Sequence, residues 1–134
     1  MTEAAIEEAK RLLRIARADL AACNALLEAP DVRFANAAFH GQQAIEKVLK
    51  AVLTRRNAAM GRTHNLLALS GQLLELGLAV PVSDDQLALL NPYAVVFRYD
   101  DIEVELLSSK ELMAMVTTTV EWAACELGKD AVAP

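Results

Sequence analysis

The stretch FANAAFHGQQAIEKVLKAVLTRR, residues 34–56, is a regular amphipathic pattern and indicates an all-α fold. Its apolar residues recur at steps of three and four, the spacing of one helical face. The preceding chain repeats this rhythm, so we expect helices over 3–28 and 32–56 that pack antiparallel, with Pro30 between them and Asp31 as the second N-cap. The two apolar stripes are Ile6, Ala9, Leu13, Ala16, Leu20, Cys23 and Leu27, and Phe34, Ala38, Gly41, Ile45, Val48 and Val52.

The first predicted helix is apolar on more than one stripe. Ala5, Leu12 and Ile15 lie outside its main stripe. A face this wide can serve both the core and a partner subunit, which is consistent with a homodimer. A fully buried helix has the same pattern, so both alternatives stay open.

A shorter helix is predicted next. Thr63 can cap it, its apolar positions run from Leu66 to Leu76, and Gly77 fits the left-handed position after its end. His64 lies at the start of this helix. It could contact an anion held by free backbone N–H groups, or it could simply pack or cap locally.

Two capping-box patterns mark the remaining helices. SDDQ at 83–86 opens a short helix through residue 90, and SSKE at 108–111 opens a last helix through residue 128. Between them, 91–107 has no helical period and predicts an extended, exposed loop. We therefore expect one domain over 1–134, an all-α, up-and-down bundle of about five helices, four long or medium and one short, with a frayed tail at 129–134.

The composition and missing motifs exclude several functional classes. No segment resembles a secretory signal or approaches the roughly 18 apolar residues of a membrane span, so a cytoplasmic protein is expected. The common phosphate-loop, dinucleotide, zinc and serine-nucleophile motifs are absent, so we expect no metal, no cofactor and no covalent hydrolase. Cys23 and Cys125 both fall at apolar helical positions and are expected to be free, buried thiols.

The net charge of −5 is unevenly distributed along the chain. Residues 31–64 carry six basic and two acidic side chains, whereas residues 65–134 carry three basic and eleven acidic ones. Such a split can steer an anionic ligand to one surface, or it can merely keep the protein soluble.

A polar edge runs along the second predicted helix, opposite its apolar stripe. Its members fall within about 80° of one another on a helical wheel. They offer an imidazole, an amide and two ammonium groups, which suit phosphate or ribose oxygens, although a solvated face is the alternative. The members are Asn36, His40, Gln43, Lys47, Lys50 and Thr54.

The segment NPYAVVFRYDD, residues 91–101, places aromatic residues around one arginine. Arg98 with Tyr93 and Tyr99 can bind a phosphate or stack on a base. The alternative is a loop held on the bundle by its aromatic rings, with Arg98 paired to Asp100 or Glu46.

Three blocks in order resemble one known family. They are FHGQQAIEKVLKAVL at 39–53, RTHNLLAL at 62–69 and NPYAVVFRY at 91–99, followed by the capped final helix. Together, over nearly the whole chain, they resemble the HEPN domain family (higher eukaryotes and prokaryotes nucleotide-binding). The resemblance implies a bundle of about five helices and usually a homodimer. It also implies a role beside a minimal nucleotidyltransferase, often as the toxin half of a toxin–antitoxin pair, and many members are metal-independent endoribonucleases.

The ribonuclease members of this family carry an arginine followed, after four to six residues, by a histidine. Arg98 is the candidate catalytic arginine here, but the histidine positions read Glu103, Val104 and Glu105. Acidic side chains there would repel an RNA backbone and donate a proton poorly at neutral pH. The chain instead resembles the Arg-Tyr branch of the family, with Asp100 where that branch has a proline, so nucleotide binding is expected rather than catalysis.

The resemblance thus implies a nucleotide-binding protein with a minimal nucleotidyltransferase partner. A degenerate endoribonuclease and a purely structural, partner-stabilising module are the alternatives, and the bound partner could be a nucleotide or RNA. The candidate binding residues are His40, Gln43, Glu46, Lys47 and Lys50 from the second helix, His64 from the third, and Tyr93, Arg98 and Tyr99 from the loop.

Overall fold

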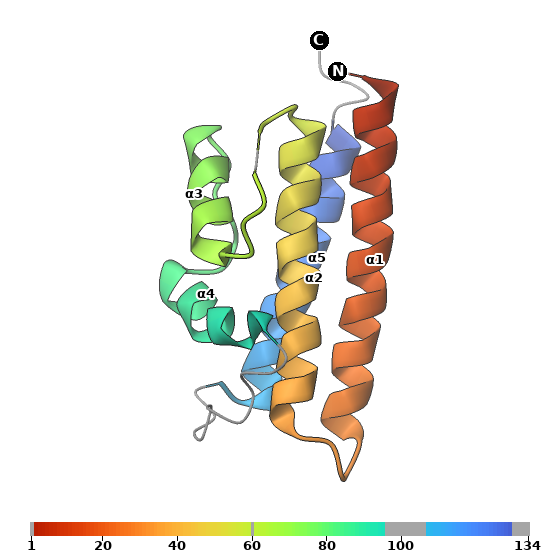
Figure 1. Ribbon diagram of the computed structural model, residues 1–134, viewed down its shortest axis with the longest axis vertical. Coiled ribbons are helices and arrows are strands. Elements are labelled where there is room, and N and C mark those ends of the chain that lie inside the picture. Colours follow the sequence, from red (N-terminus) through yellow and green to blue (C-terminus); the bar gives the residue numbers. More distant parts are fainter. Residues whose placement is uncertain (1, 60, 96–106, 130–134) are drawn as a thin grey trace.

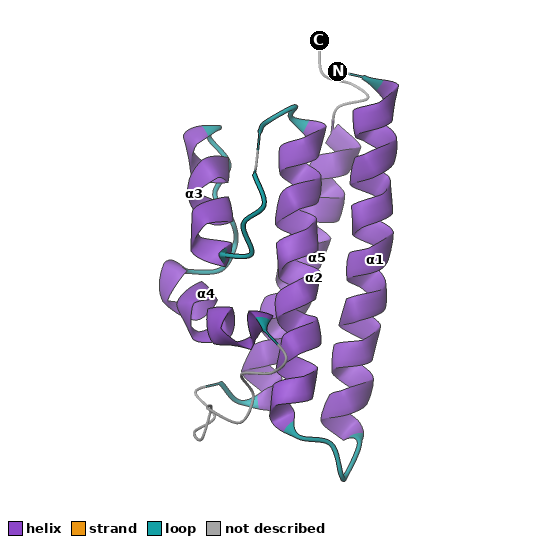
Figure 2. Ribbon diagram, in the orientation of Figure 1, coloured by secondary structure: helices purple, strands orange, loops and turns teal. Residues whose placement is uncertain are grey.

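A computed structural model describes residues 2–59, 61–95 and 107–129 of the chain. Its elements are α1 (Glu3–Glu28), α2 (Phe34–Arg55), α3 (Leu66–Glu75), α4 (Asp84–Leu90), the 3-10 turn η1 (Asn91–Ala94) and α5 (Ser109–Gly128). The three long helices α1, α2 and α5 run side by side, α3 and η1 contact the other flank of α2, and α4 packs against α3 and η1 (Figure 1). Figure 2 shows only helices and loops in these described ranges, which confirms the predicted all-α bundle.

The first two helices form the predicted antiparallel pair (Figure 1). Helix α1 has the expected bounds and begins with a cap in which Thr2 Oγ1 accepts a hydrogen bond from Ala5 N. The expectation that Asp31 caps α2 is wrong. Residues 30–32 form the turn between the helices, and the N-cap is Arg33, whose side chain makes no capping hydrogen bond.

Helix α3 begins later than its predicted cap. The N-cap is Asn65, whose side chain accepts a hydrogen bond from Leu67 N. Thr63 is therefore not the cap, and its hydroxyl oxygen accepts a hydrogen bond from Asn65 N instead. At the other end Gly77 has a φ of 82°, the left-handed conformation predicted for that position.

Both predicted capping boxes are present, at the starts of α4 and α5. The loop predicted over 91–107 is wrong in its first part, because η1 continues directly from α4 with Pro92 in its first turn, where proline is tolerated. Tyr93 is only 3% exposed, and its ring lies edge-on to Phe34 at a centroid distance of 6.0 Å. Residues 96–106 lie outside the described part of the chain.

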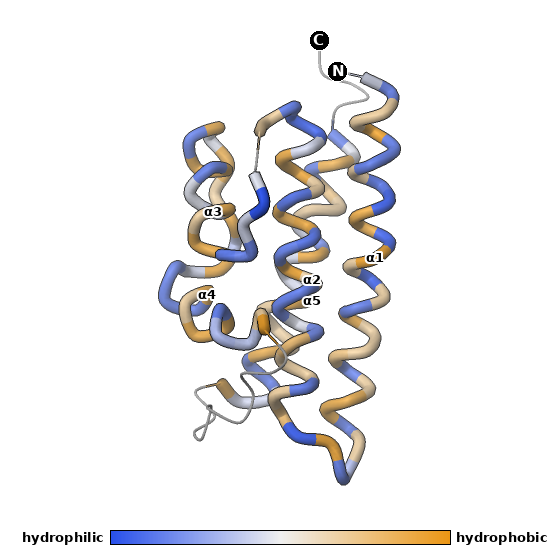
Figure 3. Tube along the Cα trace, viewed as in Figure 1, coloured by the Kyte–Doolittle hydropathy of each residue, from blue (hydrophilic) through white to orange (hydrophobic). Residues whose placement is uncertain are grey.

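Helix α2 lies at the centre of the bundle, and each of its residues is buried or half-buried. In Figure 3 polar and apolar residues alternate along it, as an amphipathic helix requires. Ala37, Ala44 and Ala51 are fully buried, as are Ala9 and Ala16 of α1. Small side chains on both helices allow a close approach of the two backbones, and α1 and α2 share the most extensive interface in the bundle.

Gly41 lies where α2 packs against both α1 and α5. A Cβ atom added there would lie 3.0 Å from Cδ1 of Leu112, 3.1 Å from Cγ2 of Val116 and 3.4 Å from Sγ of Cys23. Only glycine leaves room for these neighbours at their present positions. This packing sets the axial position of α2 relative to α1 and α5. It therefore also positions the polar side chains before and after Gly41 in the sequence.

The expectations for α1 and for the cysteines have mixed outcomes. Leu12, outside the predicted stripe, is buried with Ala9 and Ala51 in a small cluster. Both thiols are free, as predicted, and Cys23 is buried, which raises its thiol pKa to about 11. Cys125 is exposed, so its predicted burial is wrong.

Among the described residues no helix is long and apolar enough to cross a membrane.

Candidate functional site

The polar edge of α2 is partly enclosed by its neighbours rather than fully solvated. All six of its predicted members, Asn36, His40, Gln43, Lys47, Lys50 and Thr54, are half-buried. The side chains along this helix turn in two directions: His40 contacts α1, whereas Glu46, next to the edge, contacts the segment that leads into α3. The polar edge is therefore not a fully solvated face of the helix.

Glu46 is the centre of one group of contacts. Its side chain is only 3% exposed, yet Oε2 lies 3.1 Å from Lys50 Nζ and 2.9 Å from His64 Nδ1, and Oε1 accepts from Gln42 Nε2 at 3.2 Å. Burial alone would raise the pKa of this carboxyl, but the hydrogen bonds from His64, Lys50 and Gln42 together outweigh burial and lower it. We call these four residues the Glu46 cluster, and its carboxylate is charged at neutral pH.

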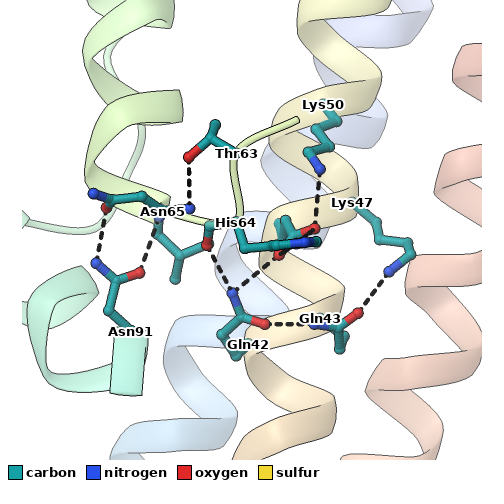
Figure 4. Close-up of polar contacts among 10 residues, drawn as sticks. Gln42, Gln43, Lys47, Lys50, Thr63, His64, Asn65 and Asn91 are labelled. Atoms are coloured by element: carbon teal, nitrogen blue, oxygen red, sulfur yellow. Dashed lines mark hydrogen bonds and ion pairs between the residues drawn. The ribbon is translucent and has the colours of Figure 1, made fainter. Parts of the chain in front are cut away.

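A chain of amide contacts joins the Glu46 cluster to the polar edge. Gln42 Nε2 also donates to the backbone oxygen of His64 at 3.2 Å, and Gln42 Oε1 accepts from Gln43 Nε2 at 2.7 Å. Gln43 Oε1 in turn accepts from Lys47 Nζ at 2.8 Å. Figure 4 shows this chain, with Lys47 on the side of α2 that faces α1. The orientation of both glutamine amides is thereby fixed by contacts at each end.

Lys47 differs from Lys50 in its electrostatic partner. Lys50 is neutralised by the carboxylate of Glu46, whereas Lys47 has only the neutral amide oxygen of Gln43 as a partner in the described part of the chain. An anion can therefore bind Lys47 without displacing a carboxylate.

His64 is held by the Glu46 cluster and not by the start of α3. Its side chain is 69% exposed, and Nδ1 is the atom that contacts Glu46. The backbone N–H groups expected to be free are occupied: Leu66 N donates to Asn91 Oδ1 at 2.9 Å, and Leu67 N donates to Asn65 Oδ1 at 3.0 Å. An anion site on those amides is therefore not formed (Figure 4).

His40 has a carboxylate partner that the sequence interpretation did not name. Its Nδ1 lies 3.0 Å from Oδ1 of Asp19, on α1, with side-chain exposures of 34% and 18%. The Phe39 ring stands edge-on to the imidazole at a centroid distance of 5.3 Å. Nε2 has no partner in the described part of the chain, so it is the free nitrogen of this ring.

Of the predicted loop residues, Tyr93 is described by the structure, and it does not join this arrangement. Tyr93 belongs to the core beside Phe34, so its ring is not placed to stack on a base. Arg98, Tyr99 and the acidic positions after them lie outside the described residues. No group of three metal-ligating side chains occurs in the described ranges.

The sequence interpretation missed three polar residues that organise the site. Gln42 is fully buried at the junction of the two groups of contacts, Asn91 holds the start of α3, and Asp19 pairs with His40. The sequence does single out Asp19, because it is the only acidic residue between Glu8 and Glu28 on α1. The other two lie in the quoted motifs HGQQ and NPY, but no spacing rule indicates their partners.

Comparisons with known proteins give one match. A family model described as HEPN domain matches residues 9–126, which is most of the chain. No curated protein and no solved structure matches it. The matched range contains both the polar edge of α2 and the Glu46 cluster.

Proposed function

Since the chain belongs to the HEPN domain family, we propose that it binds a nucleotide along the polar edge of α2, with the phosphates at Lys47. The observation that carries this proposal is the ammonium group of Lys47, 2.8 Å from a neutral amide oxygen and without a carboxylate partner among the described residues. Phosphate binding there gains a charge-assisted hydrogen bond and breaks no ion pair.

The Glu46 cluster supports this assignment by holding the neighbouring groups still. Lys50 pairs with the buried carboxylate of Glu46, so its charge is largely compensated, and the same carboxylate holds the imidazole of His64. Gln43, fixed by Gln42, presents its amide beside Lys47. A ligand thus meets a preorganised surface with one uncompensated cation, which lowers the ordering cost of binding.

We further propose that the protein acts as a homodimer with a minimal nucleotidyltransferase protein, in a toxin–antitoxin pair. Family membership supports this assignment. In that setting Arg98 and Tyr99 would add a phosphate contact and a stacking ring from the loop. The missing histidine after Arg98 favours a binding role over RNA cleavage.

A thermal-shift panel of nucleotides tests the proposal. Ligand binding to the folded state raises the melting temperature, so at least one nucleotide should stabilise the protein. The Lys47→Ala variant should lose this shift, whereas Lys110→Ala, which removes an exposed lysine of α5, should keep it. A purely structural module would show no shift with any nucleotide.

A further inference from the structure

The contact between Asp19 and His40 is an organised pair that the phosphate site at Lys47 does not use. A carboxylate that accepts from Nδ1 fixes the orientation of the imidazole ring. In the neutral ring it places the proton on Nδ1 and leaves a lone pair on Nε2. The half-buried position of both side chains and the edge-on Phe39 ring restrict the imidazole further.

Along α2, the ammonium of Lys47 is held about one helical turn after His40. Gln43 is three residues after His40, so the two side chains are neighbours on the helix surface. Lys47 extends back to the amide oxygen of Gln43, which brings its charge to the level of that residue. One helical turn rises about 5.4 Å, so a hydrogen-bond acceptor at Nε2 and a cation at Nζ are placed to contact two different groups of one ligand.

From this geometry we infer that the Asp19–His40 pair binds a ribose hydroxyl of the nucleotide and makes the site selective for ribonucleotides over dideoxynucleotides. The hydroxyl donates to Nε2 of His40, while Nδ1 of the same ring donates to Asp19. Asp19 is a positioning residue, because it acts through the imidazole and does not touch the ligand. This inference rests on the proposed nucleotide site and assigns its specificity.

Calorimetric titrations with ATP, GTP and CTP and with their 2′,3′-dideoxy counterparts test the inference. One hydrogen bond of this kind corresponds to a preference of about three- to tenfold for the ribose form. Asp19→Ala should reduce the affinity for the ribose form to that for the dideoxy form. Glu8→Ala removes a carboxylate from an exposed ion pair on the same helix and should leave the preference intact.

A second measurement reports the pair without any ligand. Nitrogen NMR of the imidazole rings at alkaline pH should show the proton of His40 on Nδ1, although a free imidazole side chain prefers Nε2. In Asp19→Ala it should move to Nε2. The proton on Nε2 in the unmodified protein would overturn the inference.

The titrations distinguish a failure of the ribose contact at His40 from a failure of the phosphate site at Lys47. Equal affinities for ribose and dideoxy forms in the unmodified protein would overturn the role of the Asp19–His40 pair and leave the phosphate site standing. A preference that survives in both Asp19→Ala and Asp19→Asn would also overturn it. If none of the triphosphates binds, the proposed function fails and the ribose contact fails with it.

Discussion

Nδ1 of His64 lies 2.9 Å from Oε2 of Glu46, although the side chain of His64 is 69% exposed and that of Glu46 only 3%. A surface imidazole thus reaches an interior carboxylate of α2. The contact ties the segment before α3 to the central helix. It also makes Glu46 the acceptor for donors from two different parts of the chain, Gln42 of α2 and His64.

Removing the carboxylate should weaken the fold. Glu46→Ala leaves the donors of Lys50, His64 and Gln42 without their shared acceptor, and we expect the free energy of unfolding to fall by about 1–3 kcal/mol. Urea unfolding monitored by circular dichroism measures this change in the free energy of unfolding. Glu75→Ala, an exposed position on α3, should change stability by less than about 0.5 kcal/mol. Equal effects of the two substitutions would contradict this prediction.

The contribution of Glu46 should depend on pH. The pKa of its carboxyl is lowered in the folded protein, so the stabilisation is fully present above its usual value of 4.5 and is lost as the pH falls through the lower, folded value. The stability difference between the unmodified protein and Glu46→Gln should therefore shrink on acidification. Urea titrations at a series of pH values provide the measurement. A difference that grows in acid would show that the pKa is raised instead.

Two glycine-to-alanine substitutions should change the free energy of unfolding in opposite directions. Gly41→Ala places a methyl group 3.0 Å from a side-chain atom of Leu112, and overpacking of this kind costs about 1–3 kcal/mol, more than the helix propensity gained. Gly71→Ala on α3 meets open space and should stabilise the protein by about 0.5–1 kcal/mol. Thermal unfolding of both variants tests the pair. A stabilised Gly41→Ala would show that the helices separate easily.

The local patterns predicted most of the fold. Capping boxes and apolar periods depend on residues within one turn, and the helices that they indicated are present. The errors arose where distant contacts compete with local signals. Thr63 has the chemistry of a cap, but Asn65 takes that role and its side chain also accepts from Asn91, 26 residues away. Tyr93 belongs to the core because Phe34 of another helix packs against it.

The candidate site was predictable only as far as one helix determines it. Helical geometry places His40, Gln43 and Lys47 on one edge without any knowledge of the fold. The partner of His40 depends on the packing of α1 against α2, because Asp19 precedes it by 21 residues. Pairwise packing of this kind leaves no periodic trace in a single sequence, which is why Asp19 was not among the predicted residues.

The two cysteines should react at very different rates. Cys125 is exposed, whereas burial raises the thiol pKa of Cys23 to about 11, so at mildly alkaline pH only on the order of one thousandth of Cys23 is thiolate. A chromogenic disulfide reagent should modify one thiol per native chain and the second only after unfolding in urea. Cys125→Ser should abolish the fast phase. Fast reaction of both thiols would mean that α1 opens readily.

The central claim, that nucleotide phosphates bind at Lys47, is tested most directly by calorimetric titration with a nucleoside triphosphate. A charge-assisted hydrogen bond contributes about 1.5–3 kcal/mol, so Lys47→Gln should bind roughly ten- to hundredfold more weakly than the unmodified protein. The matched control Lys110→Gln removes the same charge from an exposed site on α5 and should bind normally. Equal affinities of Lys47→Gln and the unmodified protein would contradict the account.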